Sequence, residues 1–165
     1  MTPAEILTDA FERVHESGLA VLDGLTDDDL RHRPGPDANP IGWLVWHLAR
    51  VQDLHVAGAA GHEQLWEEFG PRFDLPYDHA DHGYGHTSEQ VAAFSAPASL
   101  LASYLTAVHE RTVGYLRTLG PDDLDRVVDE RWDPPVTLGA RLVSVVNDDT
   151  AHVGQAEYVR GMLGR

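Results

Sequence analysis

The 165-residue chain contains no cysteine, and it also contains no lysine, because all 12 of its basic residues are arginine. Without cysteine the protein has no disulfide scaffold, no thiolate zinc site, no CxxC redox centre and no cysteine nucleophile. Without lysine it has neither Schiff-base chemistry nor a P-loop. The missing cysteines also agree with a reducing cytoplasm.

Positive charge is scarce as well, since 27 acidic residues outnumber the 12 arginines and give a net charge of −15. A surface this negative repels phosphate groups, which argues against nucleic acid and anionic membranes as partners. No apolar run reaches the roughly 20 residues of a membrane span, and the first residues lack the basic and apolar segments of a signal peptide. We therefore expect a soluble cytoplasmic protein with no nucleic-acid or membrane partner.

Helical periodicity dominates the chain, whose length favours a single domain over residues 1–165. Apolar residues recur near the 3.6-residue period in four long segments, over residues 3–24, 41–60, 97–119 and 138–163. The second segment is apolar nearly all round, so it should be central and buried. The pattern predicts an all-α four-helix bundle.

Capping residues mark three of the helix starts. Thr2 and Glu5 have the spacing of a capping box, with Pro3 at the first helical position. Asn39, followed by a proline, is the expected N-cap of the second long helix, and Thr137 is that of the last.

The connections between these helices are long. Residues 27–36 form a polar connection with room for one helical turn, and residues 70–86 are rich in Gly, Pro, Asp and His and predict a long loop. A short helix should begin near Thr87, before the third long helix. Residues 121–136 predict a structured crossing segment, and no convincing strand is present. These lengths favour a bundle topology other than simple up-down-up-down.

Ionisable residues occur where the helices should be apolar. Asp148 and His152 are four apart and project from one face of the last helix, Asp149 lies near the centre of its apolar stripe, and His47 lies in the most apolar helix. Such residues are costly to bury unless they are paired or coordinated. From spacing alone, His47 is either a hydrogen-bonded core residue or a metal ligand. Asp148 and His152 are either a salt bridge or part of a metal site.

Two stretches of sequence resemble the DinB-like (YfiT-like) superfamily. Residues 39–51, Asn-Pro-Ile-Gly-Trp-Leu-Val-Trp-His-Leu-Ala-Arg-Val, resemble its second helix, and residues 152–161 resemble its last-helix motif. Gly-Tyr-Gly-His-Thr at 83–87 resembles a loop of the actinobacterial branch. The resemblance implies a four-helix bundle, often dimeric, with a divalent metal held by three histidines. One histidine comes from the second helix and two come from the last.

Carried onto this sequence, the resemblance assigns His47 and His152 as two of the ligands. Asp148 stands where the family usually has the third histidine, and Asp149 is a possible substitute. The expected ligand set is His47, Asp148 and His152, and two histidines with one carboxylate suit an open site for Zn, Ni, Fe or Mn.

The resemblance also implies a function. The family's best understood branch uses a low-molecular-weight thiol such as mycothiol, which here would be a cosubstrate because the chain has no cysteine. We expect a homodimeric, metal-dependent thiol S-transferase or related detoxification enzyme that acts on a small electrophile. Thiol-dependent isomerisation of a small acid is a variant that needs a carboxylate-binding arginine, which the sequence does not identify. The alternative is a non-catalytic small-ligand-binding or stress-associated dimer with a degenerate metal site.

Histidines outside the expected ligand set are weaker candidates. His79, His82 and His86 lie in the 70–86 loop, which is expected either to swing over a cavity or to be an exposed polar loop that binds metal adventitiously. His55 is a candidate for support of the ligands, and His109 for a hydrogen bond inside the bundle.

Two polar residues of the last helix have open roles. Gln155 is expected either to orient a ligand or to be a surface amide, and Arg160 either to pair with Glu157 or to clamp a substrate carboxylate.

Overall fold

The computed structural model describes residues 1–165 and is mostly helical. Its elements, in chain order, are α1 (Pro3–Leu22), α2 (Asp27–Arg31), α3 (Ile41–Ala60), α4 (Trp66–Phe73), α5 (Ser88–Ala92), α6 (Ala98–Leu116), a 3₁₀ turn (Pro121–Asp125), β1 (Val127–Asp129), β2 (Val136–Thr137) and α7 (Leu138–Met162). None of the helices combines the length and the apolar character that crossing a membrane requires.

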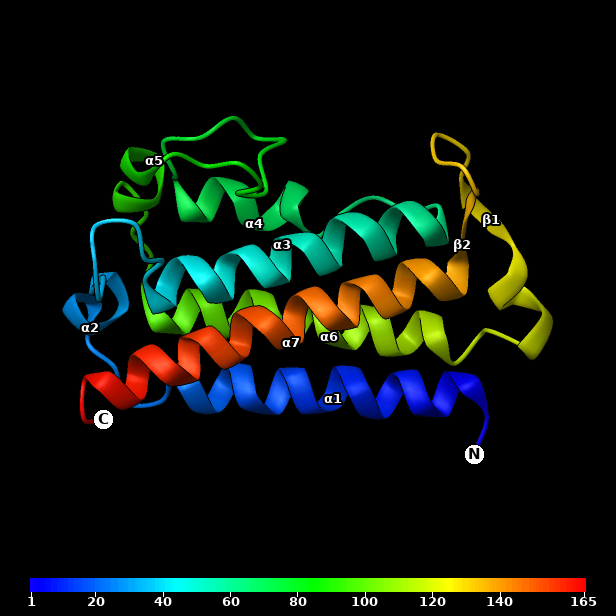
Figure 1. Ribbon diagram of the computed structural model, residues 1–165, viewed down its shortest axis with the longest axis horizontal. Coiled ribbons are helices and arrows are strands. Elements are labelled where there is room, and N and C mark those ends of the chain that lie inside the picture. The colour runs from blue at the N-terminus through cyan, green and yellow to red at the C-terminus, as the bar shows by residue number, and fades with distance from the viewer.

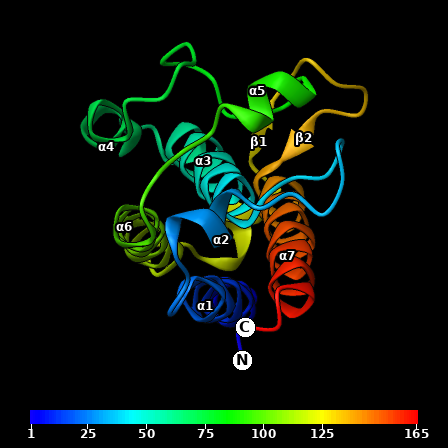
Figure 2. The same cartoon turned by 90° about the vertical axis from the view of Figure 1, so that its left-hand side faces the viewer.

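The four long helices α1, α3, α6 and α7 form a bundle (Figure 1). Viewed along its axis, α3 and α1 lie at opposite corners, and each packs against both α6 and α7 (Figure 2). The colours of Figure 1 show that α1 and α7 run in one direction while α3 and α6 run in the other. The predicted four-helix bundle and its departure from up-down-up-down order are therefore confirmed.

The direction of the helices explains the long connection between α3 and α6. Because these two helices are parallel, the chain must return along the whole bundle before α6 begins. It does so through α4, α5 and the loop of residues 74–87, which together cover one side of α3 (Figure 1). This excursion places the loop against His47 of α3.

The bundle core consists of two apolar clusters, a larger one that includes Trp46 and a smaller one that includes Phe11. Buried polar residues fall between the two clusters on three of the helices, among them Gln52 on α3, Thr112 on α6 and Asp149 on α7. The Gln52 amide donates a hydrogen bond to the Thr112 hydroxyl over 2.7 Å. A polar layer thus divides the core near the middle of the bundle.

Two of the three predicted helix caps are confirmed. The Thr2 hydroxyl accepts a hydrogen bond from the Glu5 N–H over 3.2 Å, and the Thr137 hydroxyl accepts one from the Ala140 N–H. The predicted Asn39 cap is wrong, because Pro40 is the N-cap residue of α3 and no side chain caps the helix. The start of α3 is buried, so packing replaces the cap.

Two connections differ from the prediction. The loop expected over residues 70–86 begins only at Asp74, since α4 continues through Pro71 to the buried Phe73 and packing outweighs the cost of an internal proline. The crossing segment 121–136 contains a small antiparallel hairpin, with Val127 opposite Thr137. Strands of three and two residues are too short to show a sequence period.

Candidate metal centre

The structure brings together the three residues expected to bind a metal. His47 on α3 faces Asp148 and His152 on α7, and one donor atom from each lies within 4.8 Å of the other two. The His47 Nε2 atom is 3.9 Å from Asp148 Oδ2, and the centroids of the two imidazole rings are 4.5 Å apart. Metal binding itself remains a prediction.

Hydrogen bonds to backbone carbonyls orient both imidazole rings. His47 Nδ1 bonds to the carbonyl oxygen of His82, and His152 Nδ1 bonds to the carbonyl oxygen of Asp148 over 2.7 Å. Because a carbonyl oxygen only accepts, each Nδ1 must carry the proton. Each Nε2 therefore keeps a free lone pair, which is the tautomer that a metal-binding histidine requires.

The pKa values of the two histidines in the cluster shift in opposite directions. Burial lowers the pKa of His47 to about 4, although the carbonyl of His82 acts in the opposite direction. Burial also disfavours a charged His152, but its contacts with the Asp148 carboxylate and carbonyl outweigh this, so the pKa of His152 is raised. The pKa of Asp148 is lowered, because the nearby imidazoles outweigh the effect of burial.

The donor atoms fit a divalent cation. Asp148 Oδ2 is buried without a well-aligned hydrogen bond, and it lies 3.3 Å from His152 Nδ1. A lone pair of His47 faces this oxygen, so two acceptors meet with no proton between them. A cation would satisfy both, and two imidazoles with one carboxylate leave positions open for a ligand.

Asp149, the possible substitute for Asp148, is not part of this cluster. Its side chain is 0% exposed, and neither carboxylate oxygen has a hydrogen-bond partner. Burial and the neighbouring charge of Asp148 raise its pKa well above the usual range. Asp149 belongs to the polar layer of the core, one helical position away from the face that carries the candidate metal ligands.

Sequence reasoning missed the role of the loop in positioning His47. The loop approaches α3 at Gly83, where φ is +95° and a Cβ atom would lie 2.9 Å from His47 Nδ1 and 2.8 Å from Trp43. Only glycine has both the backbone freedom and the space that this position requires. The Gly-Tyr-Gly-His-Thr pattern was the available signal, because it contains this glycine.

A chain of polar contacts fixes the loop and the ring beneath it. The Asp81 carboxylate accepts hydrogen bonds from His86 Nε2 over 2.9 Å and from the Gly83 N–H over 3.0 Å. The other ring nitrogen of His86 accepts a hydrogen bond from the Trp43 indole over 3.1 Å. Trp43 in turn stacks on His47, with ring centroids 4.8 Å apart.

The sequence profile of the DinB superfamily matches residues 10–156. The chain belongs to the DinB superfamily. It is also similar to a conserved protein of Enterococcus faecalis whose crystal structure is known. The two share 33% identity and a TM-score of 0.90, with 100% of this chain and 99% of that chain covered. No curated protein sequence matches the chain.

The histidine-rich loop of this DinB chain contacts α3 through His82 and Gly83. The His86 side chain is buried and pairs with Asp81. The backbone carbonyl of His82 accepts a hydrogen bond from His47. Only His79 is a surface residue, where it contacts Glu67 over 3.1 Å. Three nearby histidines therefore have three separate environments, and both expectations for the loop stay predictions.

The remaining candidates are placed away from the metal cluster. His109 makes no hydrogen bond through Nδ1 and stacks on His15. Gln155 is an exposed amide on α7. Arg160 neither pairs with Glu157 nor faces a substrate cavity. It donates hydrogen bonds to carbonyls at the end of α1, which fastens the two helix ends together.

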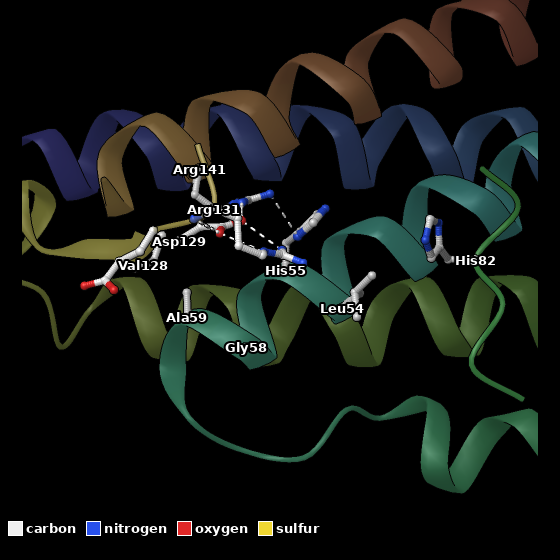
Figure 3. Close-up of a pocket in the computed structure, with 10 residues that line it drawn as sticks. Leu54, His55, Gly58, Ala59, His82, Val128, Asp129, Arg131 and Arg141 are labelled. Atoms are coloured by element: carbon white, nitrogen blue, oxygen red, sulfur yellow. Dashed lines mark hydrogen bonds and ion pairs between the residues drawn. The ribbon is translucent and has the colours of Figure 1, made fainter. Parts of the chain in front are cut away.

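A cavity of about 700 Å³ lies between α3 and the hairpin (Figure 3). His82, whose carbonyl holds His47, lines one part of it, and His55, Arg131 and Arg141 line another. Burial lowers the pKa of His55 to about 4, and the charge of Arg141 acts in the same direction. In this DinB protein a cavity large enough for a small molecule is therefore lined by His82, the residue whose carbonyl contacts the candidate ligand His47.

Proposed function

We propose that this DinB protein is a metal-dependent enzyme that transfers a low-molecular-weight thiol of the mycothiol type to a small electrophile. The observation that carries the proposal is that His47, Asp148 and His152 each bring one donor atom within 4.8 Å of the other two. His47, Asp148 and His152 would hold a divalent Zn, Ni, Fe or Mn ion. Such an ion would lower the pKa of a thiol that binds at its open positions.

In the proposed reaction, the sulfur of the thiol forms a bond to an electrophilic carbon while the bond from that carbon to its leaving group breaks. The leaving group departs with the bonding electron pair, and the thiol proton passes to solvent. His47, Asp148 and His152 would be occupied as ligands of the ion, and the pKa of His55 is about 4, so none of these groups would serve as the base. The other residues would bind and orient the reactants.

The test uses untagged protein purified without added metal, because the chain itself contains ten histidines. Elemental analysis should find about one metal ion per chain in the wild type. A thiol should then react faster with 1-chloro-2,4-dinitrobenzene in the presence of the protein, and His152→Ala or a chelator should remove the acceleration. A rate that neither treatment changes would overturn the proposal.

One observation favours the second candidate, a small-ligand-binding protein without catalysis. His152 lies 3.3 Å from the Asp148 carboxylate, and its raised pKa favours an ion pair that needs no metal. In that case chelators should leave the melting temperature unchanged. A fall in melting temperature that one added metal reverses would contradict this candidate and support the enzyme.

The cytoplasmic location and the homodimer also belong to the proposal. They rest on the family resemblance and on the thiol cosubstrate. Sedimentation of the purified protein and fractionation of the producing cells test them independently of the chemistry.

A further inference from the structure

Arg50 on α3 is the one arginine of the chain whose side chain is buried, at 1% exposure. Burying a charged group is costly unless acceptors meet its donors. The carboxylate paired with it, that of Asp53, lies 3.8 Å from a terminal nitrogen of the guanidinium, which is too long for a hydrogen bond. The other contacts of Arg50 therefore decide what this buried charge does.

The carboxylate of Asp53 is occupied by other donors. It accepts hydrogen bonds from the Leu65 and Trp66 N–H groups at the start of α4, over 3.0 and 2.8 Å. It also accepts one from the Tyr104 hydroxyl of α6 over 2.8 Å. Asp53 thus joins α3 to α4 and α6, and the guanidinium of Arg50 must bond to acceptors elsewhere.

The better acceptors of Arg50 lie in the segment between α3 and α6. A terminal nitrogen donates to the Gln64 side-chain oxygen over 2.9 Å, and Nε donates to the backbone carbonyl of Asp81 over 3.3 Å. The flat face of the guanidinium lies over the Trp66 ring, 4.7 Å from its centroid. Because the guanidinium is rigid and planar, these contacts together direct its Nε–H bond at the loop.

Arg50 and the candidate ligand His47 reach the same loop. They are three residues apart on α3, so they project from one side of the helix. Their side chains bond to consecutive carbonyl groups of the loop, that of His82 for His47 and that of Asp81 for Arg50. Figure 3 shows His82 on the loop where it passes α3.

The peptide group between His82 and Gly83 is held at both of its polar atoms. Its carbonyl bonds to His47 Nδ1, and its N–H donates to the Asp81 carboxylate over 3.0 Å. The preceding peptide group is held through its carbonyl by Arg50. Because each peptide group is planar, fixing two in succession leaves the His82 carbonyl little freedom to turn away from the imidazole.

We infer that Arg50 is a positioning residue for the candidate metal centre. It holds the loop so that the His82 carbonyl keeps the ring proton of His47 on Nδ1 and leaves Nε2 free for a cation. The inference rests on the proposed metal site, to which it adds a residue outside the ligand set. No hydrogen bond or ion pair joins Arg50 to any of the three candidate ligands, so it acts on them through the loop.

The test follows the His47 ring by nitrogen NMR in metal-free protein at pH 7.5, well above its pKa of about 4. The two ring nitrogens have different shifts in the two neutral tautomers, and the wild type should show the Nδ1–H form alone. Arg50→Lys keeps a positive charge near Asp53 but lacks the Nε–H donor. The ring should then populate both tautomers, and competition with a chromogenic chelator should show zinc affinity lower by about tenfold.

The matched control is Tyr104→Phe, which alters the same buried network on the side away from the loop. It removes the hydroxyl that donates to Asp53 and leaves the bond from Arg50 to the Asp81 carbonyl in place. It should lower the melting temperature without changing the ring tautomer or the zinc affinity. Equal changes in both variants, or an unchanged ring in Arg50→Lys, would overturn the positioning role.

Gly83→Ala provides the test if Arg50→Lys does not fold. It displaces the loop from His47 and leaves Arg50 itself unaltered. The Nε–H proton of Arg50 should then exchange faster with solvent in the same variant in which the His47 ring changes its tautomer. A changed ring beside an Arg50 Nε–H as protected as in the wild type would contradict the inference, because the two loop contacts would then be independent.

The ring measurement needs neither a metal nor a thiol, so the two proposals can fail separately. If the wild type binds no zinc, the metal-dependent function fails, and a change of tautomer in Arg50→Lys still supports the positioning role. If the wild type binds zinc and the ring is the same in Arg50→Lys, the positioning role fails and the proposed function stands.

Discussion

Two groups of histidines in this molecule differ in how their separation along the chain relates to their separation in space. His47 and His152 are far apart in the chain, yet their rings lie 4.5 Å apart on two packed helices. His79, His82 and His86 are close in the chain, yet they contact a surface glutamate, line a cavity and pair with a half-buried aspartate, respectively. Helix packing gathers donor atoms, whereas the loop disperses its side chains.

The helices and the loop contribute to the candidate site in different ways. The helices supply the candidate ligands at fixed positions, and the loop supplies the hydrogen-bond acceptor that sets the tautomer of His47. A site of this kind depends on its supporting contacts almost as much as on its ligands. The predictions below test the two regions against each other.

The largest effect is expected from removing a helical histidine. His47→Ala and His152→Ala should each reduce the bound metal from about one equivalent to almost none, because two remaining donors hold a divalent ion poorly. Elemental analysis of untagged protein measures this directly.

His79→Ala is the matched control for that loss. His79 is half exposed and contacts only Glu67 and aromatic neighbours, so its removal should leave the metal content unchanged. A loss of metal in His79→Ala that equals the loss in His47→Ala would show that the loop, not the helix pair, binds the ion.

The next effect comes from two glycines of the loop. Gly83→Ala places a methyl group against Trp43 and His47, whereas Gly85→Ala has nothing within 4 Å, although φ is positive at both positions. Both variants should lose about 1–2 kcal/mol from the strained backbone. Only Gly83→Ala should also weaken metal affinity, by about 10–100-fold, as for other contacts that orient a ligand.

Thermal unfolding and competition with a chromogenic chelator separate the two effects. Equal metal affinities in Gly83→Ala and Gly85→Ala would mean that the approach of the loop to His47 has no bearing on the site.

Sequence analysis predicted the four long helices well, since their apolar periods are long and two of their starts carry capping residues. It selected His47, Asp148 and His152 because buried ionisable residues are costly and because of the family resemblance. It did not find the hairpin, whose strands are too short for a period. It also did not find that Arg131 and Arg141 both pair with Asp129, because only the fold of the hairpin brings the three residues together.

The extension of α4 and the role of the loop were missed for a related reason. Local signals at Pro71 and Gly83 indicate turns, and only tertiary packing shows that one lies within a helix and the other against a histidine. Tertiary contacts override local preference at both positions.

A smaller effect is expected from His86, which links the loop to the aromatic ring above His47. His86→Phe keeps an aromatic ring in the buried position but loses the hydrogen bonds to Asp81 and to the Trp43 indole. Metal affinity should fall by about tenfold, at the lower end of the range for supporting contacts. The chelator competition measures it, and an affinity equal to that of the wild type would show that stacking alone positions Trp43.

The smallest effect concerns a third pair of histidines, which lies outside both regions and has no carboxylate contact. His15 and His109 stack with ring centroids 4.2 Å apart, and burial lowers the pKa of both rings, that of His109 to about 4. The unfolded chain takes up protons near the ordinary histidine pKa of about 6.5, whereas the folded protein resists them down to about pH 4. Stability should therefore fall as the pH drops through this window.

His109→Phe should retain the stack and remove this titration, together with a buried ring nitrogen that has no hydrogen-bond partner. Urea unfolding from pH 7.5 to pH 4 should then show a shallower loss of stability, by about 1 kcal/mol after allowance for the solvent around the half-buried ring. Parallel stability curves for the two proteins would show that the stacked pair does not contribute. Burial is the largest cause of the lowered pKa of both rings, so the result shows mainly what burial does to a histidine that lacks the contacts that orient His47 and His152.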